Sequence, residues 1–140
     1  MAKKTIPIKF DGYWRAVNRS GLPAESGVYC VYTCTHNKTE GTVTLHKLVY
    51  IGESTNVRDR VASHEKTEKW ETHLKAGQEL CFSCGLVDEN ERRRAEAALI
   101  FKHKPPENTE YRDDFPFDET TISLTGKTAL LNANFTVQRT

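Results

Sequence analysis

The residues with the clearest chemical potential lie between positions 48 and 64, where the chain reads LVYIGESTNVRDRVASH. An apolar run brings Tyr50 to a glycine, and a polar stretch then leads into a segment that carries Arg60 and His64. A planar guanidinium offers paired hydrogen-bond donors to an anion such as a phosphate, and the question is what these side chains would share. Taken singly, such residues more often serve in packing or at the surface, and this stretch alone does not decide between the two interpretations.

Two strands are expected to bring a second tyrosine to the same place. Residues 27–34, GVYCVYTC, begin with a glycine and are rich in valine and tyrosine, which is typical of a strand. Residues 35–42 form a polar turn, and residues 43–51, VTLHKLVYI, form the next strand, which ends at Gly52. If the two strands pair as a hairpin, Tyr29 and Tyr50 lie near each other at its base.

A helix is expected to follow this hairpin. Ser54 or Thr55 is a suitable N-cap, and Val57 and Val61 recur at the spacing of one helical turn, which marks a buried side. A second stripe with the same spacing consists of Asn56, Arg60 and His64. The sequence therefore predicts that Arg60 and His64 project from one helix in the same direction.

The second half of the chain predicts a further strand and a long helix. After a short helix at 70–76, residues 79–87 form the strand, and Asp88 with Glu91 resembles a capping box. The helix then covers 89–103 and stops at Lys104 and the two prolines after it. Its expected buried side consists of Ala95, Ala98, Leu99 and the aliphatic stem of Lys102. Residues 120–137 predict a late hairpin around Gly126, and residues 1–26 are interpreted as polar, basic and loop-like.

From Leu22 to Asn108 the chain resembles the GIY-YIG nuclease family. The motifs that carry the resemblance are GVY at 27–29, YIG at 50–52, Arg60 with His64, Glu96 in EAALI, and Asn108 in PPEN. The resemblance implies an α+β fold with a small three-stranded antiparallel sheet flanked by helices. We expect a basic N-terminal extension (1–21), the nuclease domain (22–108), and an acidic segment with a C-terminal hairpin packed on the same domain (109–140). Valine replaces the isoleucine of the first motif, and 20 residues separate the two tyrosines.

The resemblance also implies the activity, a metal-dependent endonuclease that hydrolyses phosphodiester bonds in DNA with one Mg²⁺ or Mn²⁺ ion. By resemblance, Tyr29 would be the general base and Tyr50 would order the attacking water or the phosphate. A tyrosine has an ordinary pKa of about 10, so a nearby cation such as Arg60 or the metal must lower that pKa for the base role to operate.

The remaining site residues would support the phosphate and the metal. Arg60 would hold the scissile phosphate with His64 assisting, and Glu96 would be the metal ligand. One carboxylate is enough because Mg²⁺ keeps several waters and also takes phosphate oxygens. Asn108 would hold the loop or helix near the site.

Two further functions remain open on the sequence. The fold could serve as a DNA-binding or scaffolding module without turnover, since the net charge is only +1 and residues 107–119 hold six acidic residues and one basic residue. A zinc or redox role would use Cys30, Cys34, Cys81 and Cys84. Cys81 and Cys84 are expected to point to opposite faces of one strand, which favours buried thiols over a zinc site.

The remaining features concern surroundings and partners. The triple 92–94, RRR, is interpreted as a solvated helix face, with phosphate contact as the alternative. No apolar run is long enough to span a membrane, and the N-terminus lacks the apolar segment of a secretory signal. We therefore expect a cytoplasmic protein with DNA as its partner and no membrane contact. Cutting both strands of a duplex would need two copies of a chain with one site, so a homodimer is a further expectation.

Overall fold

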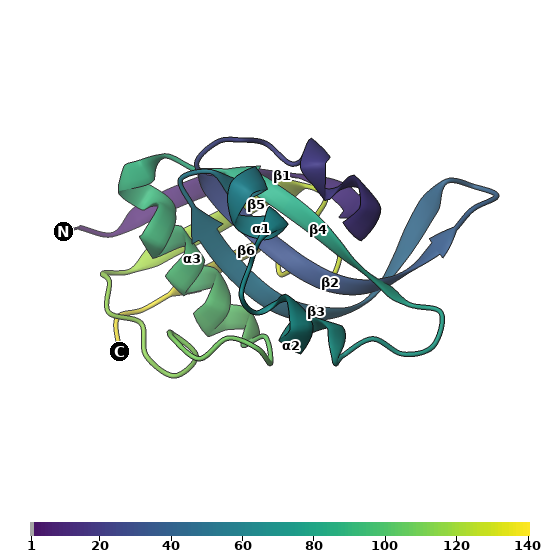
Figure 1. The fold of residues 1–140 in the computed structure, drawn as a ribbon. Helices are drawn as coiled ribbons and strands as arrows, with labels where there is room; N and C mark the ends of the chain where they lie inside the picture. The colour runs from purple at the N-terminus through teal and green to yellow at the C-terminus, as the bar shows by residue number, and fades with distance from the viewer. Residues whose placement is uncertain (1) are drawn as a thin grey trace.

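The computed structural model describes residues 2–140, whose strands form one mixed six-stranded sheet in the order β3-β2-β4-β1-β5-β6 (Figure 1). The strands are β1 (Lys4–Arg15), β2 (Gly27–Asn37), β3 (Thr42–Ser54), β4 (Glu79–Leu86), β5 (Thr120–Gly126) and β6 (Asn134–Val137). The helices are the 3-10 helix η1 (Ala16–Gly21), α1 (Val57–Ala62), α2 (Thr67–Glu71) and α3 (Glu89–His103).

The α+β class is confirmed, but the prediction of a three-stranded sheet is wrong. Strands β2, β3 and β4 form the expected antiparallel unit, and β1 then pairs with the free side of β4 and in parallel with β5. Residues 4–15 were interpreted as loop-like, but they form β1, in which the alternate side chains of Ile6, Ile8 and Phe10 are buried. Pro7 hides this alternation from sequence analysis, because proline is unusual inside a strand. At Pro7, however, β1 pairs with β5 and not with β4, so the missing N–H of proline removes no hydrogen bond to β4.

The two faces of the sheet carry two separate apolar cores. On one face, Ile6, Phe10 and Cys30 pack with Ala95 and Leu99 of α3. The opposite core is formed by Leu22, Tyr29, Val57, Val61, Trp70 and Phe82. Figure 1 shows α3 on one side of the sheet and α1 with α2 on another. Side-chain alternation along β2 therefore sends Tyr29 and Cys30 to different layers.

The β2–β3 hairpin is longer than predicted and projects beyond the rest of the sheet (Figure 1). Strand pairing continues to Asn37 and Thr42 at the tip, where the Gly41 amide donates to the Asn37 carbonyl at 2.8 Å. Most of the 20 residues between the two tyrosines thus extend the two predicted strands, and the turn narrows from 35–42 to 38–41.

Helix ends differ from the predictions in four details. Asn56, and not Ser54 or Thr55, is the N-cap of α1, because its side chain accepts from the Asp59 amide. Helix α1 ends at Ala62, so His64 lies beyond it. Helix α2 covers Thr67–Glu71 instead of 70–76, and the N-cap of α3, Asp88, makes no side-chain capping bond. The end of α3 at His103 is as predicted, with the next residue in the left-handed region.

The late hairpin is confirmed, and it joins the sheet. Strand β5 pairs with β6 from Thr120 to Ser123, and its other side pairs with β1. Gly126 ends β5 with φ +81°, and a side chain there would lie 2.2 Å from the Phe10 carbonyl oxygen. The chain can therefore turn away from β1 only because residue 126 is glycine.

Candidate active site

A cavity of about 420 Å³ opens at the β3 edge of the sheet. Its walls come from β2, β3, α1, α3 and the segment 108–111 that follows α3. Five of the six residues chosen from the sequence line this cavity: Tyr29, Tyr50, Arg60, Glu96 and Asn108. The cavity thus brings together side chains that are far apart in the chain.

Tyr29 lies against Gly52, its partner across the β2–β3 ladder. A Cβ atom at position 52 would lie 2.4 Å from the Tyr29 hydroxyl oxygen, so only glycine leaves room for the ring. Tyr29 is buried, and this burial raises the pKa of its hydroxyl well above the ordinary value. The glycine that ends the YIG motif therefore determines where Tyr29 can sit.

Tyr50 stands beside Tyr29, with ring centroids 6.3 Å apart and an angle of 37° between the planes. Its side chain is less buried, and burial followed by the charge of Glu96 raises its pKa to about 12. Arg60 acts in the opposite direction and lowers the pKa of both tyrosines. Both hydroxyls carry their protons at neutral pH in this state.

Arg60 forms a salt bridge with the carboxylate of Glu65. Its two terminal nitrogens contact the two oxygens of Glu65 at 2.7 and 2.8 Å. Hydrogen bonding to Arg60 lowers the pKa of Glu65 to about 2. A planar fork that binds a carboxylate in this way can bind two phosphate oxygens with the same geometry, so phosphate and Glu65 compete for one site.

His64 packs behind the tyrosines and is not among the residues that line the cavity. Its ring centroid lies 4.4 Å from that of Trp70 and 5.4 Å from that of Tyr50. Nδ1 accepts a hydrogen bond from the Lys66 amide, and burial lowers the pKa of the ring to about 4. Glu65 approaches Nδ1 to 3.4 Å, but the neutral ring forms no ion pair with it at neutral pH. The prediction that His64 shares a helical stripe with Arg60 is wrong, because α1 ends at Ala62 and His64 lies outside the helix.

Glu96 enters the cavity from the middle of α3. Burial raises its pKa to about 8, and the charges of Glu53 and Glu110 act in the same direction, whereas Arg93 and Arg92 lower it. Three carboxylates thus line the same cavity. Among residues 2–140, no three Asp, Glu, His or Cys side chains come close enough to hold one ion together. This donor set fits an ion such as Mg²⁺ that binds through one or two carboxylates and keeps its waters.

Asn108 fastens the segment after α3 to β3. Its side-chain oxygen accepts from the Ile51 amide at 2.9 Å, and its side-chain nitrogen donates to the Ile51 carbonyl at 2.8 Å. The Glu107 amide adds a bond to the Val49 carbonyl at 3.1 Å. These bonds fix the position of α3 and Glu96 relative to Tyr50.

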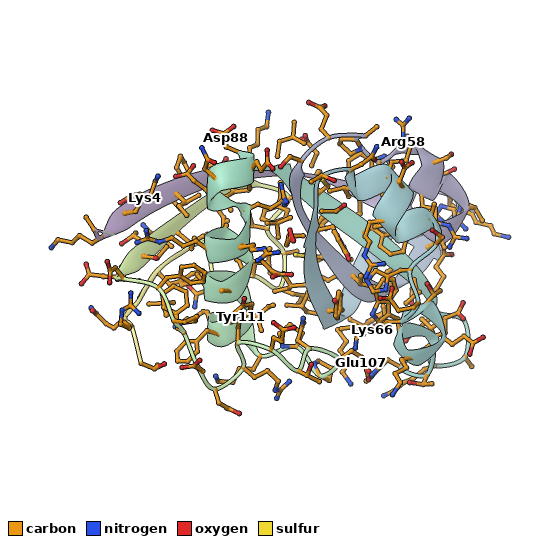
Figure 2. The ribbon with its side chains drawn as sticks, turned by 60° about the vertical axis from the view of Figure 1, so that its left-hand side comes forward. Lys4, Arg58, Lys66, Asp88, Glu107 and Tyr111 are labelled. Atoms are coloured by element: carbon orange, nitrogen blue, oxygen red, sulfur yellow. The ribbon has the colours of Figure 1, made fainter. Side chains whose placement is uncertain are left out.

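Several lining residues were not proposed from the sequence: Glu53, Lys66, Ile100, Thr109, Glu110 and Tyr111. Arg93 also lines the cavity, and the sequence offered it only through the alternative of phosphate contact by the triple 92–94. Figure 2 shows Tyr111 near the C-terminal half of α3, with Lys66 and Glu107 toward α2. Glu53 directly follows the YIG motif, which is a local signal that could have identified it. Lys66 and Tyr111 carry no such signal, since only the folded chain brings them to the cavity.

The arginine triple separates into three environments. Arg92 is buried and contacts Glu53 at 2.7 Å, and Arg94 is buried and donates to Thr120 at 2.7 Å. The solvated-face interpretation is therefore wrong for these two residues, whereas the exposed Arg93 lines the cavity. The four cysteines are buried free thiols, and Cys81 and Cys84 belong to opposite cores as expected.

The fold and cavity define a small α+β domain with tyrosine, arginine and glutamate side chains around one polar site. The family model of the GIY-YIG catalytic domain matches residues 28–111, which is more than half of the chain. The chain therefore belongs to the GIY-YIG family, and this membership indicates a nuclease. No curated protein and no solved structure matched the chain. No helix in residues 2–140 is long and apolar enough to span a membrane.

Proposed function

We propose that the protein is a metal-dependent endonuclease that hydrolyses phosphodiester bonds in DNA at this cavity. The observation that supports the proposal most strongly is the convergence of Tyr29, Tyr50, Arg60, Glu96 and Asn108 on one cavity. Family membership supports the nuclease class. The Mg²⁺ or Mn²⁺ requirement, the DNA substrate and the residue roles are parts of the proposal.

In the proposed reaction, Arg60 exchanges Glu65 for two oxygens of the scissile phosphate. Tyr29 and Tyr50 hold the attacking water. As the water oxygen bonds to phosphorus and the bond from phosphorus to the leaving oxygen breaks, Tyr29 accepts the water proton and passes its own hydroxyl proton on to the leaving oxygen. Burial opposes this step by raising the pKa of Tyr29, while the positive charge of Arg60 assists it.

Glu96 would hold the divalent ion, which when bound supplies Lewis-acid stabilisation to the charge that develops on the phosphate oxygens. Asn108 maintains the relation of α3 to β3. His64 would support the rings of Tyr50 and Tyr29 from behind, because it is neutral and buried.

Plasmid cleavage with Mg²⁺ or Mn²⁺ tests the proposal. The wild type is expected to nick or linearise plasmid, and Glu96→Ala and Tyr29→Phe are expected to abolish cutting. Glu89→Gln is the matched control, since Glu89 is exposed on the first turn of the same helix and outside this cavity. Equal cutting by Glu96→Ala would refute the proposed role of the cavity.

The same assay separates the alternative of a non-catalytic DNA-binding module. Binding of duplex, single-stranded and branched DNA without any cutting would support that alternative. Linear product formed without a nicked intermediate would support a homodimer, which sedimentation of the free protein tests independently.

A further inference from the structure

A second cavity, of about 530 Å³, lies beside the projecting β2–β3 hairpin and the segment that follows α2. The ionisable side chains that line it are His46, Lys47, His73 and Lys75. No carboxylate is among its lining residues, in contrast to the first cavity, which contains three. We call the surface formed by these four side chains the basic groove.

The backbone of β3 explains why Lys47 faces this groove. Side chains three positions apart in a regular strand point to opposite faces, so Lys47 and Tyr50 should diverge. However, Tyr50 pairs with Val31, and Lys47 pairs with Thr33. Three steps along β3 therefore match two steps along β2, which means that β3 contains one extra residue between these pairs. This one-residue bulge turns Lys47 to the face of Tyr50. Since these three steps span only two regular steps of about 3.4 Å each, Lys47 lies roughly 7 Å from Tyr50 along the strand.

Contacts between side chains connect the groove to the candidate active site. Lys47 Nζ lies 3.0 Å from His73 Nδ1, and His73 Nε2 lies 2.7 Å from a carboxylate oxygen of Glu107. Lys47 Nζ can donate only, so Nδ1 of His73 is the acceptor in the first contact and Nε2–H donates to Glu107 in the second. Glu107 immediately precedes Asn108, which lines the active-site cavity, so these contacts link the groove to that cavity through two neighbouring residues.

We infer that the basic groove binds the DNA backbone beside the phosphate that is cut at the first cavity. A groove that is lined by two lysines and no carboxylate suits a polyanion, and the nearby carboxylate of Glu107 is engaged by His73. The offset of the groove along β3 places it where neighbouring phosphates of the same DNA would lie. Such contacts position the backbone without reading sequence. The inference rests on the proposed function, because it takes the bound DNA to have its scissile phosphate at Arg60.

The test compares the double variant Lys47→Ala/Lys75→Ala with Lys9→Ala/Lys127→Ala, which removes two exposed lysines outside both cavities. Binding of a fluorescein-labelled duplex is measured by anisotropy in EDTA across a salt series. Each lost phosphate contact lowers the slope of log K against log salt by about 0.9. The groove variant is therefore expected to lose about 2 from the slope and to bind about tenfold more weakly or worse, and the control variant to match the wild type.

The outcomes separate this inference from the proposed function. If the wild type cuts DNA and the groove variant keeps the wild-type slope and KM, the groove inference is wrong and the nuclease stands. If the wild type binds without cutting and the groove variant loses slope, the groove is supported and the catalytic proposal fails. A wild type that binds no DNA overturns the groove inference as well.

Discussion

Replacing Glu96 with glutamine should stabilise the metal-free protein at alkaline pH. The pKa of Glu96 is raised from 4.5 to about 8, mainly by burial and then by the nearby charge of Glu53. The folded protein therefore holds the Glu96 proton more tightly than the unfolded chain does. Between pH 4.5 and 8 this group's contribution to stability falls as the pH rises, because the unfolded chain ionises first.

The size of this effect follows from the shift. Each pKa unit corresponds to about 1.4 kcal/mol, so a shift from 4.5 to about 8 sets an upper limit of about 5 kcal/mol on the destabilisation by ionised Glu96. Solvent and the exposed Arg93 at the cavity screen part of this charge, and we expect about 2 kcal/mol. For a chain of this size that is a rise of roughly 6–8 °C in Tm for Glu96→Gln above pH 8.

The assay is thermal unfolding from pH 4 to pH 9 in EDTA, for the wild type, Glu96→Gln and the Glu89→Gln control. The difference between Glu96→Gln and the wild type should be absent below pH 4.5 and reach its full value above pH 8. A difference that does not change with pH would refute the argument. Adding Mg²⁺ or Mn²⁺ at pH 8.5 should raise the Tm of the wild type and not that of Glu96→Gln, because an ion that binds only the folded state stabilises it.

Three further changes test the geometry of the cavity. Asn108→Leu leaves the buried main-chain groups of β3 unpaired, and urea unfolding should show a loss of about 2–4 kcal/mol. Gly52→Ala pushes the Tyr29 ring out of place, so cleavage should fall by about a hundredfold, with near-ultraviolet circular dichroism reporting the displaced ring. Glu65→Gln weakens the competitor for Arg60, and a lower KM for DNA is expected, whereas an unchanged KM would show that no exchange of partners limits binding.

The strands and helices next to the motifs could be predicted because their signals are local. The valine and tyrosine run that begins at Gly27 located β2, and the run that reaches Gly52 located β3. The spacing of Val57 and Val61 located α1. Strand β1 was missed because Pro7 interrupts a short alternation that becomes a strand only once β5 offers a partner. Its partners β4 and β5 lie far along the chain, and no short sequence window contains all three strands.

Side-chain environments that depend on distant partners could not be predicted. Arg92 and Arg94 look like a charged helix face, but their partners Glu53 and Thr120 come from two different strands. The bulge in β3 is also invisible in the sequence, because hydrophobic alternation predicts a face but not a register. Without the bulge, Lys47 would be assigned to the face opposite Tyr50.

The segments outside the family match form the far half of the sheet and not the site. Every residue that lines the first cavity falls between positions 29 and 111, inside the match at 28–111. Strands β1, β5 and β6 lie beyond β4, on the side of the sheet opposite β3. They reach α3 through Arg94, which donates to Thr120 and to the Ala2 carbonyl. These strands therefore hold α3 on the side of β5, while Asn108 holds the segment after α3 on the side of the cavity.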